Sequence, residues 1–324
     1  MTVVLAGLVL VAAWPGGVAP IREQGVGGQW RRVGPQVFLD RLMLTPDSRW
    51  VVAGGSGLFI AGSSLLHWHR VGPFSSFNPV LGLSLPAAGG FAALVGAGYG
   101  LYGATSLDGR YQRLGLAAGG VHAAVVVPGH PTVIWASSDS GMWRSSDGGE
   151  HFAREDVGLR SPGSAWALYW WQGTLYGSDD SGVYRWDVRR WLPSSDQFGV
   201  VSLDPGGTSG LVASSMGDGV MVLREGHWST ADRGLPSPNH GPIAGIHVVS
   251  VSQAGDDVSY ASTMLAGVAV STDGGRSWAA RWPGLGALGV VWRVLPIGSS
   301  LLVATDSGLR SYQPPPSLSS NRPR

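Results

Sequence analysis

Two stretches of the sequence bring a serine, an aspartate and a glycine together in one spacing, Ser-x-Asp-x-Gly, with an aromatic residue three positions after the glycine. A serine and an aspartate, with His151 close to the first set, are the material of nucleophilic catalysis. The same residues also suit a tight turn, because Ser and Asp side chains bond turn backbone and glycine adopts positive φ. The two sets are Ser145, Asp147, Gly149 and Phe152, and Ser271, Asp273, Gly275 and Trp278.

The composition removes several other classes of chemistry. All 22 basic residues are arginine and the chain has no cysteine, which excludes lysine Schiff bases, P-loop lysines, thiolate nucleophiles and disulfides. The net charge of +1 argues against nucleic acid as a partner. The histidines are scattered and no glycine-rich loop opens a helix, so we expect no metal and no cofactor.

The elements that must position these residues repeat along the chain. A core of the form small-x-Gly-apolar recurs seven times, at spacings that average about 42 residues, as in propeller blades. Short apolar runs alternate with glycine and proline turns, and no long helical periodicity is present. We therefore predict an all-β fold of four-stranded blades. The repeat glycines are Gly57, Gly100, Gly141, Gly182, Gly219, Gly267 and Gly308.

The last repeat lacks a fourth strand, and an early segment of the chain supplies a matching one. Residues 29–35 (QWRRVGP) nearly duplicate residues 67–73 (HWHRVGP), the aromatic strand of the first repeat. Pairing this strand with the blade that begins near Val290 closes the ring without an open sheet edge at the seam. The prediction is a single seven-bladed β-propeller over residues 28–313, closed by an N-terminal strand that completes the last blade.

The two Ser-x-Asp-x-Gly sets fall between the predicted third and fourth strands of their blades, and they resemble the Asp-boxes of the BNR-repeat propeller superfamily. That superfamily includes sialidases, xyloglucanase-like glycosidases, sortilin-type receptors and photosystem II assembly-factor-like proteins. Residues 141–152 look most like the last group. The resemblance implies that Ser and Asp bond the turn, that the aromatic residue packs into the blade, and that the boxes are structural staples opposite the usual ligand face.

Ligands of such propellers usually meet the mouth of the central channel, where each innermost strand begins. The aromatic run at residues 166–171 suits stacking on carbohydrate or peptide, and packing between blades is the other interpretation of it. Counting back from the turn after each innermost strand predicts Asp40, Val80, His122, Trp166, Gly199, His247 and Val290 at the mouth. The candidate face for a ligand or partner is Asp40, Arg41, His122, Trp166, Trp170, His247 and Arg293.

Hydrolysis would need carboxylates at that mouth. A sialidase-like mechanism requires a glutamate there, and none of the four glutamates falls on a predicted innermost strand. Asp40 and Asp204 fall on predicted innermost strands, but Asp204 belongs to the turn at the far end of its strand. We therefore expect the two aspartates on opposite faces of the ring, which argues against their acting as a catalytic pair. Four aspartates beside repeat glycines either form an acidic, cation-binding ring or serve the turns. They are Asp139, Asp180, Asp218 and Asp306.

The two ends of the chain carry no propeller pattern. Residues 1–19 hold an apolar run at 3–13 that is too short to span a bilayer and suits a signal peptide, and residues 314–324 form a proline-rich tail that we expect to be disordered. The sequence predicts an extracytoplasmic or secreted monomer without an integral membrane span, or a cytoplasmic one if the N-terminal segment is not a signal. Its expected role is that of a non-catalytic scaffold for protein binding or complex assembly. The alternative is a secreted glycoside hydrolase or a carbohydrate-binding propeller with a glycan partner.

Overall fold

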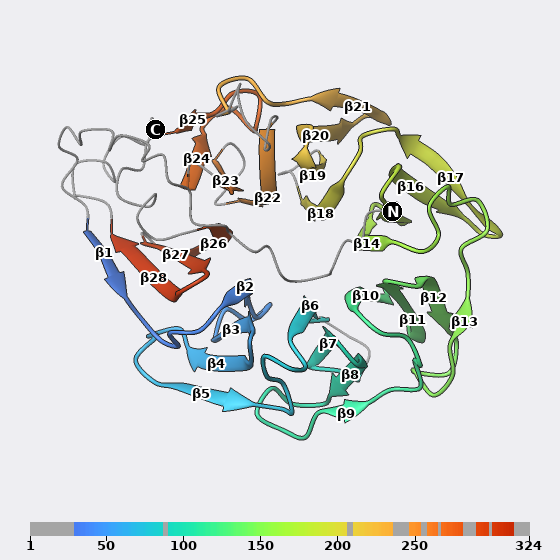
Figure 1. The fold of residues 1–324 in the computed structure, drawn as a ribbon, viewed down its shortest axis with the longest axis horizontal. Coiled ribbons are helices and arrows are strands. Elements are labelled where there is room, and N and C mark those ends of the chain that lie inside the picture. Colours follow the sequence, from blue (N-terminus) through green and yellow to red (C-terminus); the bar gives the residue numbers. More distant parts are fainter. Residues whose placement is uncertain are drawn as a thin grey trace, which may run out of the picture.

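The computed structural model describes residues 29–86, 90–205, 210–235, 246–253, 258–264, 267–280, 290–297 and 300–313. The regular structure of these ranges is 28 β-strands, and no helix in them is long and apolar enough to cross a bilayer. The strands form seven four-stranded antiparallel blades around a central axis (Figure 1). The predicted all-β, seven-bladed propeller is confirmed, whereas the expectations for residues 1–19 and 314–324 concern residues outside the described ranges.

Each blade follows the chain outward from the axis, and the first four blades use sixteen consecutive strands. Blade 1 is β2 (Leu39–Leu44), β3 (Trp50–Gly55), β4 (Leu58–Gly62) and β5 (Trp68–Val71); blade 2 is β6 (Val80–Ser84), β7 (Ala93–Ala97), β8 (Gly100–Ala104) and β9 (Gln112–Arg113). Blade 3 is β10 (Val121–Val127), β11 (His130–Ser138), β12 (Gly141–Ser145) and β13 (Ala153–Arg154); blade 4 is β14 (Ala165–Trp171), β15 (Thr174–Asp179), β16 (Gly182–Asp187) and β17 (Arg190–Ser195).

The remaining blades contain the one departure from separate sheets, a short pairing of β19 with β22 that joins blades 5 and 6. Blade 5 is β18 (Val200–Pro205), β19 (Leu211–Gly217), β20 (Gly219–Arg224) and β21 (His227–Thr230); blade 6 is β22 (Ile246–Gln253), β23 (Ser259–Thr263), β24 (Gly267–Ser271) and β25 (Ala279–Ala280). Blade 7 is β26 (Val291–Ile297), β27 (Ser300–Thr305), β28 (Gly308–Gln313) and β1 (Gln29–Arg32).

The seam of the ring lies in blade 7, where the first strand of the chain pairs with the last. β1 runs antiparallel to β28, with Trp30 opposite Tyr312. The centroids of these two rings are 4.9 Å apart, and Tyr312 is buried. The predicted closure is therefore confirmed, and the outer strand of blade 7 is covered by an aromatic pair.

The innermost strands form a closed ring around the channel. Each one contacts the next, and β26 returns to contact β2. At four blade interfaces a side chain of one blade donates a hydrogen bond to a backbone carbonyl at the start of the next inner strand. The pairs are Arg41 with Leu81, Ser137 with Trp166, Ser178 with Val200, and Ser250 with Trp292. The inner strands consequently begin at one end of the channel, which we call the mouth.

The hydrophobic core lies between the blades. Seven clusters of buried residues, one at each interface between neighbouring blades, are formed by the described residues. Blades 2 and 3 approach so closely near the mouth that a Cβ added at Gly82 would lie 2.2 Å from the carbonyl oxygen of His122. Glycine at this position is therefore required by the backbone approach rather than by a turn.

Candidate functional site at the channel mouth

Every inner strand carries a register shift of the β-bulge kind one residue after its pairing begins. A bulge leaves one residue outside the ladder and turns its side chain in a new direction, which is common beside functional sites. The mouth is therefore ringed by seven bulged positions. They are Asp40, Leu81, His122, Trp166, Val201, Val249 and Trp292.

Three of the mouth positions expected from the sequence coincide with these bulges, namely Asp40, His122 and Trp166. The other four expected positions lie one or two residues earlier than the bulge in their blades, at Val80, Gly199, His247 and Val290. The backbone of His247 takes part in the pairing that joins blades 5 and 6, opposite Met216. Its side chain lies outside what the structure describes.

The four aspartates beside the repeat glycines bond neighbouring strands, instead of forming an acidic ring or bonding only their own turns. Each one reaches across from the turn between the second and third strands to the inner strand of its own blade. Three bond a ring near the start of that strand, and Asp218 bonds the amide of Phe198, two residues before β18. The pairs are His122 Nε2 with Asp139 Oδ1 at 2.6 Å, Trp166 Nε1 with Asp180 Oδ1 at 2.7 Å, Phe198 N with Asp218 Oδ2 at 3.1 Å, and Trp292 Nε1 with Asp306 Oδ1 at 2.6 Å.

These bonds hold an aromatic stack at the mouth between blades 3 and 4. The rings of His122 and Trp166 have centroids 4.6 Å apart and planes inclined at 44°. The side chain of His122 is buried, whereas the carboxylate of Asp139 is half exposed. The stack is thus fixed from the solvent side by two carboxylates and is in place before any partner arrives.

Asp40 differs from the other mouth carboxylates. Its Oδ2 lies 3.1 Å from Arg41 Nη1, while its Oδ1 is buried and has no hydrogen-bond partner. Burial raises the pKa of Asp40, against the lowering effect of the Arg41 guanidinium. Arg41 itself is held by the Leu81 carbonyl of blade 2, with its Nε at 2.9 Å. A buried carboxyl with a raised pKa at a channel mouth is a candidate proton carrier.

Arg293 and Asp204 meet inside the channel instead of at the mouth. Arg293 Nη2 lies 2.6 Å from Asp204 Oδ1, and the Asp204 side chain is only 6% exposed. The other oxygen of Asp204 accepts bonds from Ser202 Oγ at 2.6 Å and from the Val251 amide at 3.3 Å. This aspartate links blades 5, 6 and 7, so Arg293 belongs to a structural ion pair rather than to an open ligand face.

The aromatic run of β14 is divided between the two ends of the strand. Trp166 lies at the mouth, while Trp170 lies near the opposite end, opposite Leu175 in the register with β15. Trp170 packs against the cluster between blades 3 and 4, and Tyr169 and Trp171 pack against the cluster between blades 4 and 5. The structure therefore separates Trp166 from Trp170 and places most of the run between blades.

The two Ser-x-Asp-x-Gly turns have the bonds that the resemblance implies. In blade 3, Ser145 Oγ donates to Asp147 Oδ1 at 2.7 Å and accepts from the Gly149 amide at 2.9 Å. In blade 6 the same two bonds of Ser271 are 2.8 Å each. Both turns join the third and fourth strands, at the end of the channel opposite the mouth. The serine hydroxyls of both turns are engaged in these hydrogen bonds and are not free nucleophiles.

The carboxylates of these turns have lowered pKa values, whereas the pKa of Asp40 is raised. Burial tends to raise the pKa of Asp273, but hydrogen bonds from Ser277, Ser271 and the Arg276 amide lower it to about 2. Asp147 is also lowered in pKa, mainly by the amide of His151 and the hydroxyl of Ser145. Both carboxylates are therefore ionised anchors of the backbone.

One grouping in the blade 3 turn could not be read from the spacing of the histidines. Asp147, Glu150 and His151 bring potential metal-ligand atoms within 4.8 Å of one another. All three residues are exposed, and Asp147 already bonds Ser145 and both the amide and the ring of His151. The arrangement is explained by the turn.

Comparison with known proteins places the fold. No protein-family model and no curated protein sequence matches the chain. Among solved structures, YCF48 bound to D1 peptide superposes with a TM-score of 0.64 at 12% identity, over 91% of this chain and 99% of that one. U3-55K gives a TM-score of 0.67 at 12% identity, over 88% and 98% of the two chains.

A third neighbour is an enzyme. The GH74 xyloglucanase from Xanthomonas campestris superposes with a TM-score of 0.65 at 18% identity, over 88% of this chain. The chain spans about half of that enzyme, 53% of its length. At these identities the likeness is one of fold, and the neighbours include propellers of the assembly-factor and glycosidase groups that the Ser-x-Asp-x-Gly turns resemble.

Proposed function

We propose that this propeller is a non-catalytic scaffold that binds a protein partner across its mouth. The observation that carries the proposal is a set of aromatic side chains along blades 2 to 5, which we call the aromatic arc: Phe77, Tyr99, Trp166 and Phe198. Phe77 is 84% exposed, Tyr99 60% and Phe198 63%. Each lies in a loop on the mouth side of its blade, and Trp166 lies between them at its bulge.

The arc is held in place by hydrogen bonds. The loop that carries Phe77 closes with a bridge between Ser75 and Asn78, and Asn78 Oδ1 accepts the Tyr99 amide at 3.1 Å. The Phe198 amide is held by Asp218. Aromatic side chains presented on a fixed backbone lose little conformational entropy on binding, and they are enriched where proteins meet. Their exposure here therefore supports a protein partner with apolar side chains.

The carboxylates of the mouth favour this role over hydrolysis. Glycoside hydrolysis needs one carboxyl as acid and a second as base or nucleophile. Asp139, Asp180 and Asp306 each hold a ring of the inner strand, and Asp204 is paired with Arg293. Asp40 is the described mouth carboxyl that a hydrolase would use as its acid. The peptide bound by the YCF48 neighbour lends support to a protein ligand for this chain as well.

Affinity capture from the native host tests the proposal. The parent chain, a Phe77→Ser/Tyr99→Ser/Phe198→Ser variant and the control Leu66→Ser serve as baits, and recovered proteins are quantified by mass spectrometry. Leu66 is 77% exposed but lies between β4 and β5, away from the mouth. We expect one protein to be recovered equally by parent and control and at least about tenfold less by the triple variant.

Two results would overturn the proposal. One is equal recovery of every protein by parent and triple variant. The other is turnover of a fluorogenic glycoside by the parent that is abolished by Asp40→Asn, because that would make the mouth an active site.

A further inference from the structure

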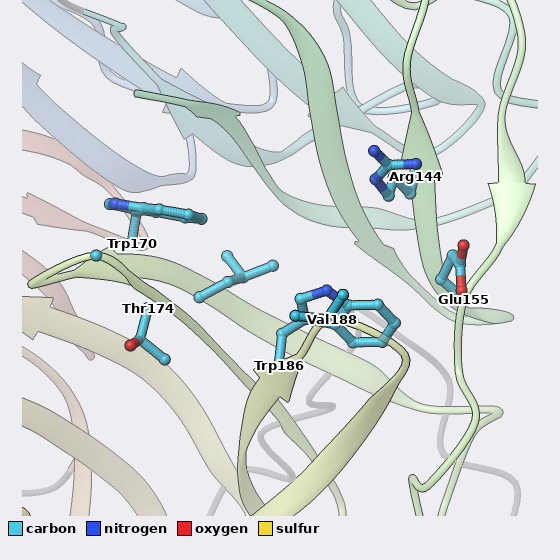
Figure 2. Close-up of a pocket in the computed structure, with 8 residues that line it drawn as sticks. Arg144, Glu155, Trp170, Thr174, Trp186 and Val188 are labelled. Carbon is cyan, nitrogen blue, oxygen red and sulfur yellow. The ribbon is translucent and has the colours of Figure 1, made fainter. Parts of the chain in front are cut away.

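A pocket of about 420 Å³ lies between blades 3 and 4, where β14 turns into β15, toward the end of the ring opposite the mouth. Figure 2 shows Arg144 and Glu155 on one side of it, Trp170 and Thr174 on the other, and Trp186 between them. The proposed partner face of the mouth does not reach this pocket. Its lining combines indole rings with charged side chains, which is the composition of a ligand site rather than of a core.

The two charged side chains of the pocket have no polar partner among the residues that the structure describes. Neither the guanidinium of Arg144 nor the carboxylate of Glu155 makes a hydrogen bond or ion pair with the described residues, and both side chains are half-buried. Arg144 pairs with Ala153 in the register, and the Glu155 amide bonds the Met142 carbonyl. The two side chains are thus diagonal neighbours on one face of the blade, within reach of long side chains. The guanidinium and the carboxylate both line the pocket and are available to a ligand there.

The aromatic part of the pocket is rigid. Trp186 is held edge-on by Trp135 at 4.7 Å and by Trp191 at 5.4 Å between ring centroids. Trp191 is itself buried and donates from Nε1 to the Glu155 carbonyl at 2.7 Å. One buried ring therefore positions both the indole of Trp186 and the backbone of Glu155. The indole of Trp186 and the backbone that carries the Glu155 carboxylate are fixed relative to each other before a ligand binds.

We propose that this pocket binds a saccharide, a pyranose with equatorial hydroxyls. The C–H face of such a ring stacks on indole, and each hydroxyl both donates and accepts a hydrogen bond. Arg144 is a donor only and Glu155 an acceptor only, so neighbouring hydroxyls satisfy both. The charges that line the pocket cancel, which suits a neutral ligand.

A dipolar ligand such as a free amino acid fits the openness of the pocket less well. Val188 on its rim is 82% exposed. Ion pairs at an exposed site are screened by water and salt and contribute little affinity. Stacking of a sugar ring on a fixed indole does not depend on ionic charge and is therefore not screened in this way. The observations therefore favour the sugar ring over the zwitterion.

Calorimetric titration of the full chain with cellohexaose, xylohexaose and chitohexaose tests the proposal, with L-tryptophan as the dipolar probe. We expect saturable binding of at least one oligosaccharide. Arg144→Gln and Glu155→Gln should each weaken it about tenfold, as loss of one hydrogen bond to a charged group implies. The matched controls are Arg185→Gln and Glu150→Gln, exposed residues of blades 4 and 3 that do not line the pocket.

Each other outcome overturns the saccharide assignment. The assignment is overturned if none of the three sugars binds the folded protein. It is also overturned if a sugar binds and both pocket variants retain that binding. Binding of L-tryptophan alone, lost in Arg144→Gln, assigns the pocket to a dipolar ligand. Trp186→Phe keeps an aromatic ring against Trp135 and Trp191 but offers a smaller face for stacking, so it should weaken sugar binding and remains informative where Trp186→Ala fails to fold. None of these variants touches the aromatic arc, so failure here leaves the mouth proposal standing.

Discussion

The interface between blades 3 and 4 is built differently at its two ends. At the mouth, the half-buried Trp166 stacks on the buried ring of His122, and the two rings are held by the carboxylates of Asp180 and Asp139. At the opposite end, Trp135, Trp186 and Trp191 hold one another by edge-to-face contacts. Polar bonds therefore orient the aromatic side chains at the mouth, where we propose that a partner binds, whereas packing of aromatic rings stabilises the opposite end. Substitutions at the two ends should therefore differ in size and in pH dependence.

The largest expected effect is at the packed end. Trp191→Ala removes a side chain that is 1% exposed, together with its bond to the Glu155 carbonyl, and should lower the free energy of unfolding by about 3–5 kcal/mol. Trp166→Ala, at a half-buried position of the mouth, should lower it by only about 1 kcal/mol. Urea unfolding followed by far-UV circular dichroism measures both. Equal losses in the two variants would contradict the distinction between the ends.

The next effect lies in the turns. Ser145→Ala leaves the buried amide of Gly149 without its acceptor and should lower the free energy of unfolding by about 1–3 kcal/mol. Ser106→Ala is the matched control, because blade 2 carries Ser106, Asp108, Gly109 and Tyr111 between its third and fourth strands, but the Gly109 amide there bonds the Ser106 carbonyl instead of the hydroxyl. The control should change stability by less than about 0.5 kcal/mol. A loss in Ser106→Ala as large as that in Ser145→Ala would show that the hydroxyl bond is not what stabilises the turn.

The fold could be predicted because its signal repeats. The glycines at the start of each third strand and the near-duplicate segments at residues 29–35 and 67–73 predicted the blade count and the closure at β1 and β28. The mouth was harder. A bulge adds one residue at a position set by the pairing of the first strand with the second, so counting from a turn missed the bulges of four blades by one or two residues.

The pocket between blades 3 and 4 could not be predicted at all. It combines the last strands of one blade with the β14–β15 turn and β16 of the next, and no spacing along the chain encodes that meeting. The sequence assigned Trp170 to the same candidate ligand face as Trp166. The two share a strand and lie toward opposite ends of it. Because β14 runs along the channel, Trp166 lies at the mouth and Trp170 lies near the opposite end.

Two carboxyls should give stability profiles of opposite sign with pH. The pKa of Asp273 is about 2 in the fold, below the value of about 3.9 in unfolded chains, so its stabilisation is present above that value and is lost as the pH falls toward 2. The pKa of Asp40 is raised by burial, so the folded state keeps that proton longer and stability falls as the pH rises above about 3.9.

Urea unfolding across the acid range measures this contrast. Asp273→Asn should be less stable than the parent at neutral pH, with the difference closing as the pH falls. Asp40→Asn should match the parent in acid and gain on it as the pH rises. If the stability gain of Asp40→Asn over the parent were greatest in acid, the sign assigned to Asp40 would be wrong. If the stability deficit of Asp273→Asn did not change with pH, the pKa assigned to Asp273 would be contradicted.

The smallest expected effect is at the mouth itself. Asp180→Asn keeps an acceptor for the Trp166 indole N–H but removes its charge, which should lower the free energy of unfolding by about 0.5 kcal/mol. The consequence for binding should be larger than that for stability, because the weaker bond to a neutral acceptor lets Trp166 leave the stack with His122 more often, and the aromatic arc then loses its preset geometry. Recovery of the partner in the capture experiment should therefore fall while the urea midpoint barely moves. If both change in proportion, the carboxylate stabilises the fold and does not orient the arc, and the distinction between the two ends of this interface fails at the mouth.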